Sequence, residues 1–149
     1  MSDAISILLI DGNDRDCDYY AWRLHGSPLR FDLARATTGR AGLDHCARQP
    51  IDCVVLEIDL PDMSGFEVLA KLVRSSSRPE IAVVMLTGHP NPYLLELALK
   101  NGAKAALQKE EPSGRTLEKS ILNAIASVKR DRALGSVKEC IGSHNFFHQ

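Results

Sequence analysis

The 149-residue sequence lacks an apolar segment long enough to cross a membrane. Its uncharged apolar stretches, such as Ala4–Ile10 and Ile81–Leu86, are far shorter than the ~20 residues of a transmembrane helix. No basic residues precede an apolar core near the amino terminus, so the pattern of a secretory signal is missing. We therefore expect a cytoplasmic protein.

An excess of charge of either sign is missing too. The 18 Lys and Arg residues balance 19 Asp and Glu residues, and no basic stripe is present, which disfavours direct binding to nucleic acid. The glycine-rich loops of nucleotide enzymes and the nucleophile elbow of hydrolases are absent, so we expect no enzyme and no cofactor. The cysteines and histidines lack the spacing of a metal site and are expected as free thiols and surface imidazoles: Cys17, Cys46, Cys53, Cys140, His25, His45, His89, His144 and His148.

Five short apolar runs predict five β-strands. Three of them are apolar throughout, which is typical of parallel strands covered on both faces. In the second run, apolar and charged residues alternate, so we expect an edge strand with one face in water. The predicted strands are Ile5–Ile10, Leu29–Ala34, Cys53–Glu57, Ile81–Leu86 and Ala105–Lys109.

Helix-period segments fall between these strands. The start and stop signals are Gly26 after the first helix, Thr37 or Thr38 before the second, the capping box of Ser64 and Glu67 before the third, Asn91, Pro92 and Gly102 around the fourth, and Ser113 near the start of the fifth. This (βα)5 alternation predicts an α/β domain over residues 4–132, built on a doubly wound parallel sheet. Residues 133–149 lose the periodicity and are expected as a tail, either loose or docked through Phe146 and Phe147.

Chemistry in such a sheet is expected beyond the carboxyl ends of its strands. Asp11 follows the first predicted strand, and Glu57 ends the third. Thr87 follows the fourth, and Lys109 ends the fifth. Two acids, a hydroxyl and an amine should therefore meet at one edge of the sheet. Taken alone, Asp11 and Asp14 could be no more than turn and N-cap residues that open the first helix.

The order and spacing of these four strand ends resemble the receiver domain of two-component response regulators over about residues 4–130. The resemblance implies a flavodoxin-like three-layer sandwich with strand order 2-1-3-4-5. It makes Asp11 the first acid of the family's acidic pair, Thr87 the switch hydroxyl and Lys109 the pocket amine. The Leu60–Gly65 turn matches the loop after the phosphorylated aspartate.

Two positions depart from the family pattern. Glu57 stands where the acceptor aspartate belongs, and Gly12 replaces the second acid. The additional methylene moves the carboxylate by roughly 1.5 Å, and misplacing a reacting group by about 1 Å can cost ~10²-fold in rate. Gly12 removes a carboxylate from the Mg²⁺ shell, which leaves Asp11 and Glu57 as weak metal candidates. We therefore expect the phosphorylation cycle to be lost.

The leading hypothesis is a stand-alone pseudo-receiver that acts by protein–protein contacts. Glu57 would bring a fixed negative charge toward Lys109 and Thr87. The resulting conformation would be locked active-like, locked inactive-like or simply neutral for signalling. One alternative is a phosphorylatable regulator that uses Glu57 or Asp59, although Asp59 is better placed to shape the loop. Another is an unrelated flavodoxin-like binding or enzyme domain.

The fourth predicted helix is apolar around most of its circumference. The resemblance implies a partner surface formed by the fourth helix, fifth strand and fifth helix, with Leu95 and Leu99 as its apolar patch. The partner would be a histidine kinase, an output protein or a second copy. The alternatives are cover by Phe146 and Phe147, or two exposed leucines without a role.

Overall fold

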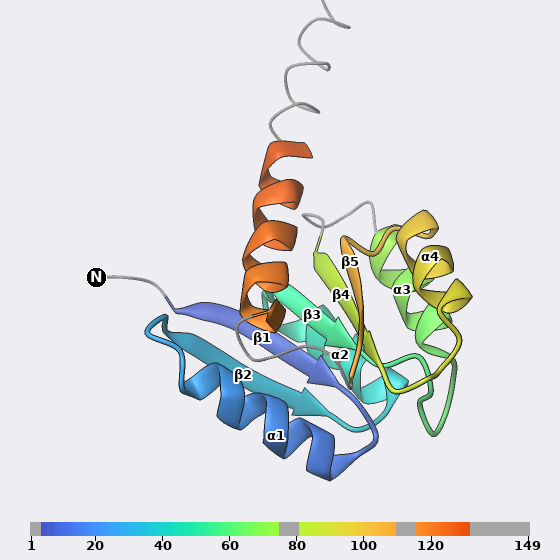
Figure 1. Cartoon of the computed structure of the whole chain (residues 1–149), viewed down its shortest axis with the longest axis horizontal. Helices are drawn as coiled ribbons and strands as arrows, with labels where there is room; N and C mark the ends of the chain where they lie inside the picture. Colours follow the sequence, from blue (N-terminus) through green and yellow to red (C-terminus); the bar gives the residue numbers. More distant parts are fainter. Residues whose placement is uncertain (1–3, 75–80, 110–115, 132–149) are drawn as a thin grey trace, which may run out of the picture.

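The computed structural model describes residues 4–74, 81–109 and 116–131. Five strands form one parallel sheet in the order β2-β1-β3-β4-β5, which confirms the expected fold (Figure 1). The strands are β1 (Ile5–Ile10), β2 (Phe31–Ala36), β3 (Cys53–Leu56), β4 (Ala82–Thr87) and β5 (Ala105–Gln108). The helices are α1 (Asp14–His25), α2 (Gly39–Arg48), α3 (Gly65–Arg74), α4 (Tyr93–Lys100) and a C-terminal helix over residues 116–131.

Two apolar clusters fill the space on either side of the sheet, so the domain has three layers. Ile7 and Leu9 face one cluster, which α1 and the C-terminal helix cover. Leu8 and Ile10 face the other cluster, which contains side chains of α2, α3 and α4. Because successive side chains of a strand point to opposite faces, one continuous apolar run of β1 contributes to both clusters.

The edge position of the second strand is confirmed, but its predicted start was two residues early. Leu29 is 41% exposed and lies in the turn, where its amide donates to the Ser27 hydroxyl at 3.0 Å. Pairing with β1 begins at Phe31, opposite Ile5. Leu29 and Arg30, which the alternation assigned to the strand, therefore belong to the turn after α1.

Local hydrogen bonds explain where the helices begin. Asn13, rather than Asp11 or Asp14, caps α1 by accepting from the Asp16 amide at 3.0 Å. Thr38 caps α2. The Ser64 hydroxyl accepts from the Phe66 amide at 3.1 Å, so the predicted capping box with Glu67 is replaced by a bond one residue earlier. Gly102, with φ of 110°, follows α4 as expected of a helix terminator.

Several predictions concern residues outside the described ranges. These are the start of the fifth helix near Ser113, the tail over 133–149 and its possible contacts through Phe146 and Phe147. Among the described helices, none combines the length and the apolar character needed to span a membrane.

Candidate functional site

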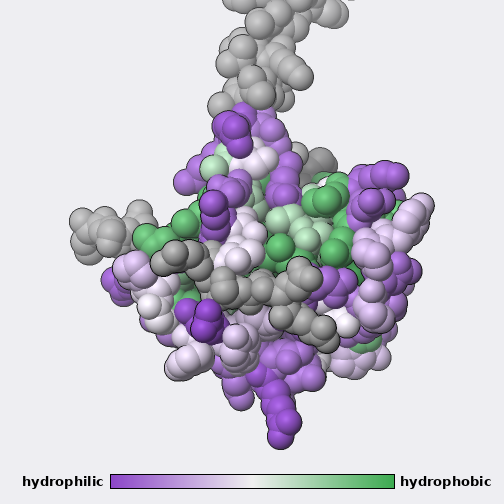
Figure 2. Space-filling model, viewed as in Figure 1, coloured by the Kyte–Doolittle hydropathy of each residue, from purple (hydrophilic) through white to green (hydrophobic). Residues whose placement is uncertain are grey.

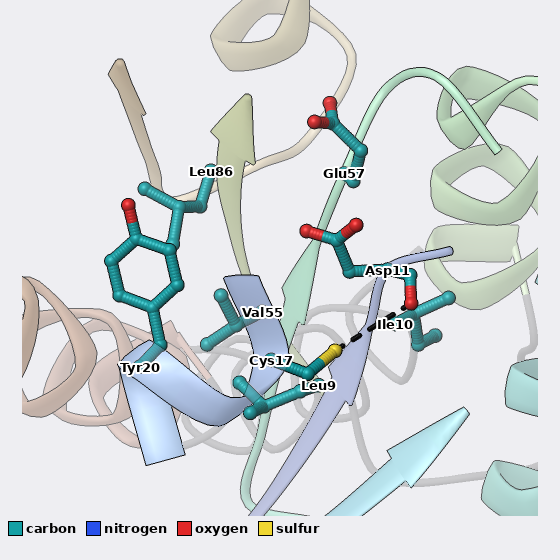
Figure 3. A pocket seen from close by; sticks show the side chains of 8 residues that line it. All are labelled: Leu9, Ile10, Asp11, Cys17, Tyr20, Val55, Glu57 and Leu86. Carbon is teal, nitrogen blue, oxygen red and sulfur yellow. Dashed lines mark hydrogen bonds between the residues drawn. The ribbon is translucent and has the colours of Figure 1, made fainter. Parts of the chain in front are cut away.

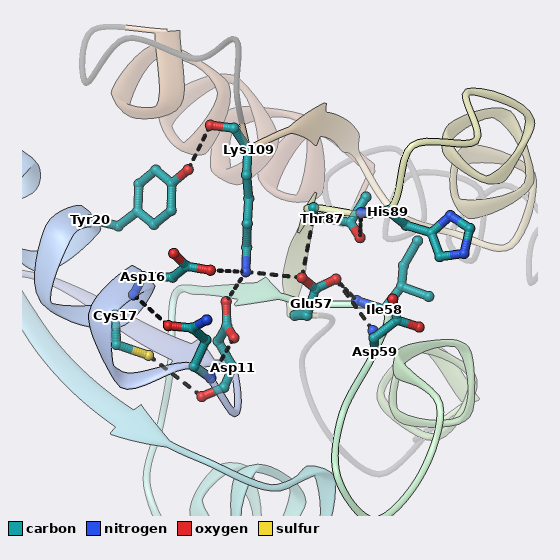
Figure 4. A network of polar contacts seen from close by, with 12 residues as sticks. Asp11, Asp16, Cys17, Tyr20, Glu57, Ile58, Asp59, Thr87, His89 and Lys109 are labelled. Carbon is teal, nitrogen blue, oxygen red and sulfur yellow. Dashed lines mark hydrogen bonds and ion pairs between the residues drawn. The ribbon is translucent and has the colours of Figure 1, made fainter.

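The four side chains predicted to meet at the carboxyl edge of the sheet do so. Asp11 and Glu57 directly follow β1 and β3, Thr87 is the last residue of β4, and Lys109 directly follows β5 (Figure 4). An open hollow of about 610 Å³ lies over this edge, lined by Asp11, Gly12, Asn13, Asp16, Glu57, Asp59, Leu60, Pro61, Gly88, His89, Pro90 and Lys109. His89, the histidine nearest the site in sequence, therefore lies at its rim.

Lys109 forms the centre of the site. Its Nζ atom lies 2.6 Å from Asp11 Oδ2, 2.6 Å from Asp16 Oδ2 and 2.9 Å from Glu57 Oε1. Burial alone would lower the pKa of Lys109, but the hydrogen bonds to these three carboxylates raise it well above its ordinary value. The ammonium therefore stays charged at neutral pH.

Glu57 has hydrogen-bond donors on both of its carboxylate oxygens. Oε1 accepts from the Gly88 amide at 3.2 Å in addition to Lys109. Oε2 accepts from the Ile58 amide at 2.5 Å and the Asp59 amide at 3.3 Å. Burial would raise the pKa of Glu57, but hydrogen bonds from Thr87 and Lys109 bring it below its ordinary value. Glu57 is thus an ionised acid with donors on both of its carboxylate oxygens.

Thr87 is fully buried, and its hydroxyl acts both as a hydrogen-bond donor and as an acceptor. The hydroxyl donates to the Glu57 carboxylate and accepts from the His89 amide at 3.0 Å (Figure 4). This arrangement fixes the hydroxyl toward Glu57 and connects it to the first residues after β4. The predicted switch hydroxyl and the predicted acceptor position are therefore in direct contact.

The pKa of Asp11 is shifted in the opposite direction to that of Glu57. Its Oδ1 atom accepts from the Asn13 amide at 2.9 Å, and its Oδ2 atom contacts Lys109. Burial nevertheless outweighs these bonds and raises the pKa of Asp11 above its ordinary value. Beneath it, a small cavity of about 10 Å³ lies between the site and the apolar core (Figure 3). The cavity is lined by Leu9, Ile10, Asp11, Cys17, Tyr20, Val55, Glu57 and Leu86.

Two residues of the site, Asp16 and Tyr20, were not predicted from the sequence. Asp16 is the third carboxylate on Lys109, and the Tyr20 hydroxyl donates to the Lys109 carbonyl oxygen at 2.9 Å. Tyr20 shares the helical spacing of Cys17, Ala21 and Leu24, so periodicity alone assigns it to the apolar face of α1. Asp16 and Tyr20 are four residues apart and therefore lie on the same face of the helix. This spacing, close after Asp11, is the signal that could have indicated polar contacts from α1 to the site.

Gly12 and Asp59 lie beside the site but do not take part in the ion-pair cluster. A Cβ atom at Gly12 would be 2.9 Å from both Cδ and Cγ of Pro61, so a side chain there requires the loop to shift. Asp59 is exposed and forms an isolated backbone bridge with Ser64, in keeping with a role in shaping the loop. The same loop is tied to α2 by Asp62, whose carboxylate accepts from the Gly39 and Arg40 amides at 2.8 and 2.9 Å.

The residues present do not fit the Mg²⁺ ion that the fold suggests. Asp11 and Glu57 both direct an oxygen at the Lys109 ammonium, so an ion between them would have to displace it. Gly12 offers no side-chain oxygen to an ion that prefers octahedral oxygen ligands. Within the described ranges, no group of three or more acidic, histidine or cysteine side chains has an arrangement suited to a metal. The carboxylates are arranged around an ammonium.

Comparisons with known proteins agree with this fold. The family description that matches residues 7–121 is the response regulator receiver domain. A probable cyclic di-GMP phosphodiesterase of Vibrio cholerae is 33% identical over 98 residues, which are 66% of this chain and 22% of that protein. The transcriptional regulatory protein FixJ of Azorhizobium caulinodans is 32% identical over 111 residues, 73% of this chain and 50% of FixJ. The chain thus spans half or less of these two relatives.

Solved structures show the same architecture. The signal receiver domain of an HD domain-containing protein from Pseudomonas fluorescens has a TM-score of 0.77. The two share 24% identity, with 89% of this chain and 95% of that one covered. A response regulator receiver domain from Clostridium thermocellum has a TM-score of 0.73 and 27% identity, covering 87% of this chain and 98% of its own.

Proposed function

This chain belongs to the response regulator receiver domain family of two-component signalling, and we propose that it signals without phosphorylation of an acceptor side chain. Domains of this family are typically signal receivers and not enzymes in their own right. The observation that carries the proposal is the state of Glu57, an ionised carboxylate at the acceptor position. Its hydrogen-bond donors come from the segments that follow β3, β4 and β5 and from Thr87.

A fixed carboxylate provides part of what a phosphoryl group would provide. Phosphorylation adds about −1.5 to −2 charges and three acceptor oxygens. Glu57 supplies one charge and two oxygens, and these already engage Thr87 and Lys109. This engagement supports one fixed conformation of the pocket. The charge of Glu57 is smaller than that of a phosphoryl group. Binding of a partner protein is therefore the measurement that distinguishes an active-like from an inactive-like conformation.

The reactivity of Glu57 is the direct test of the proposal. Intact-mass measurement after incubation with Mg²⁺ and acetyl phosphate should show no added phosphoryl group. A receiver domain that carries an acceptor aspartate, treated in the same tube, controls for the reagent. Addition of one phosphoryl group that is abolished by Glu57→Gln or Asp59→Asn would overturn the proposal and favour the phosphorylatable alternative.

We also propose that Mg²⁺ binds weakly or not at all. The ion would compete with an ammonium placed 2.6 Å from Asp11 and 2.9 Å from Glu57. Thermal unfolding should therefore have the same midpoint with Mg²⁺ and with a chelator. A midpoint that rises with Mg²⁺ concentration would show binding to the folded state and contradict this part of the proposal.

Output is proposed to pass through the surface formed by α4, β5 and the C-terminal helix. Leu99 on α4 is 48% exposed, and Leu95, one helical turn earlier on the same face, is partly buried. Tyr93 and Leu97 are also exposed but lie on another face of the helix. Figure 2 shows hydrophobic surface gathered between the C-terminal helix and α4, over the β4 and β5 region. A signalling protein or a second copy of the chain would cover it.

Replacement of one exposed leucine tests this surface. Leu99→Glu should leave the unfolding midpoint nearly unchanged, because the side chain is half exposed. Sedimentation velocity and binding to the cognate kinase or output protein, once identified, should both be measured. If Leu99→Glu alters neither self-association nor partner binding, the output surface lies elsewhere.

A further inference from the structure

Helix α1 contacts Lys109 at two points, and these contacts are made one helical turn apart. Asp16 Oδ2 lies 2.6 Å from the ammonium, and the Tyr20 hydroxyl donates to the carbonyl oxygen of the same lysine at 2.9 Å (Figure 4). Because the ammonium and the main chain of Lys109 are held by the same helix, α1 restrains both ends of this residue.

The contact with Asp16 completes the hydrogen bonding of the ammonium. A lysine ammonium has three N–H donors. Three carboxylates surround Lys109 Nζ within 2.9 Å, and Asp16 is the one that α1 contributes. Without Asp16, one donor would be free to turn toward the open hollow above the sheet, and the ammonium could move away from Glu57.

Both contacts from α1 come from well-anchored residues. The Asp16 amide donates to the side chain of Asn13, which fixes the first turn of the helix. Tyr20 is 5% exposed and packs in the apolar cluster between α1 and the sheet. A charged group at the start of the helix and a buried phenol one turn later therefore hold Lys109 from a rigid support.

We propose that Asp16 is a positioning residue, which together with Tyr20 holds the Lys109 ammonium against Glu57. The proposal rests on the proposed function, because it explains how the fixed charge of Glu57 keeps its partner without a metal ion or a phosphoryl group. It gives α1 a role that neither the family motif nor the acidic pair of the first strand assigns to it.

A simpler alternative is that Asp16 only adds negative charge to the pocket. Asp14 provides the matched comparison, because it lies in the same first turn, is exposed and does not contact Lys109. If charge alone mattered, Asp14→Asn and Asp16→Asn would have similar effects on Lys109. If position matters, only Asp16→Asn should release the ammonium.

The experiment measures the exchange of the Lys109 ammonium protons with water by ¹⁵N NMR on the full chain. Loss of one charge-assisted hydrogen bond in Asp16→Asn should speed exchange about tenfold. Tyr20→Phe should speed it less, and Asp14→Asn should leave it unchanged. The amide spectrum of each variant reports whether the fold is kept, and Tyr20→Phe provides a second reading if Asp16→Asn fails to fold.

Two outcomes would overturn this inference. One is unchanged exchange in Asp16→Asn, and the other is an equal increase in Asp14→Asn. Either result together with an unphosphorylated wild type leaves the proposed function intact and removes only the role of Asp16. Phosphorylation of the wild type by acetyl phosphate would overturn the proposed function whatever the exchange rates show.

Discussion

The Oε1 atom of Glu57 lies 2.9 Å from the Nζ atom of Lys109, and the two side chains are only 7% and 12% exposed. The longer arm of glutamate, compared with aspartate, is thus used to reach the pocket amine. This buried pair does not stand alone, since Asp11 and Asp16 share the same ammonium. Its contribution can be measured by substitutions that remove one charge at a time.

Glu57→Gln should lower the free energy of unfolding at neutral pH by about 1–3 kcal/mol, because the buried ammonium loses one charged partner while retaining two. Urea unfolding measures this directly. The matched control is Asp18→Asn, which removes the carboxylate of the exposed Arg35–Asp18 pair and should have a much smaller effect. Equal effects of the two substitutions would mean that burial of the Glu57 pair adds nothing.

The stabilising effect of Glu57 should disappear in acid. Its pKa in the folded state lies below the ordinary value of 4.5, so its contribution is present above about pH 4.5 and is lost as the pH falls through the lower folded value. Asp11, whose pKa is raised by burial, changes stability in the opposite sense on acidification. The quantity to follow is therefore the difference in unfolding free energy between wild type and Glu57→Gln, which should shrink in acid. A constant difference would contradict the ionised state of Glu57.

Stability should also fall in alkali. Burial raises the pKa of Tyr20 to about 12, and the pKa of Lys109 is raised as well. A group whose folded pKa is raised contributes fully below its unfolded value, here 10.0 for Tyr20, and loses that contribution as the pH rises through the folded value. Absorbance titration of the wild type should show one phenol ionising near pH 12, and Tyr20→Phe should remove that transition. If the transition that Tyr20→Phe removes lies near pH 10 instead, Tyr20 is exposed to water.

Two glycines of the site should differ in their response to an added methyl group. Gly12→Ala brings a Cβ atom to 2.9 Å from the Pro61 ring and should destabilise the fold by about 1–3 kcal/mol. Gly88→Ala meets only Lys109 Cδ, at 3.6 Å, which is an ordinary contact, and should be close to neutral. Thermal unfolding of both variants gives the comparison. A Gly12→Ala variant as stable as the wild type would show that the loop carrying Pro61 yields easily.

The fold was predictable because each strand carries its own signal. Continuous apolar runs identified the inner strands, and the alternation around Phe31 identified the edge strand, but not its start. That boundary depends on pairing with Ile5, which lies far away in sequence. The cap of α1 was missed for a related reason, since Asn13 competes with two neighbouring acids and only the backbone path selects it.

The site was predictable where a strand end fixes the position of a side chain. Asp11, Glu57, Thr87 and Lys109 all belong to this group, and the structure brings them together. Asp16 reaches the same point from a helix, so its role depends on how α1 crosses the sheet, which local sequence does not encode. Tyr20 is otherwise a typical core residue, but the same crossing of α1 brings its hydroxyl into a hydrogen bond with the Lys109 carbonyl oxygen.

The carboxylate of Glu57 is synthesised with the polypeptide, and its donors are supplied by the same polypeptide. A phosphoryl group can be hydrolysed within the lifetime of a receiver, whereas this charge persists until the molecule is degraded. On the proposed function, the strength of the signal is therefore set by copy number. Control would pass to transcription and proteolysis, and the response time would be that of protein turnover.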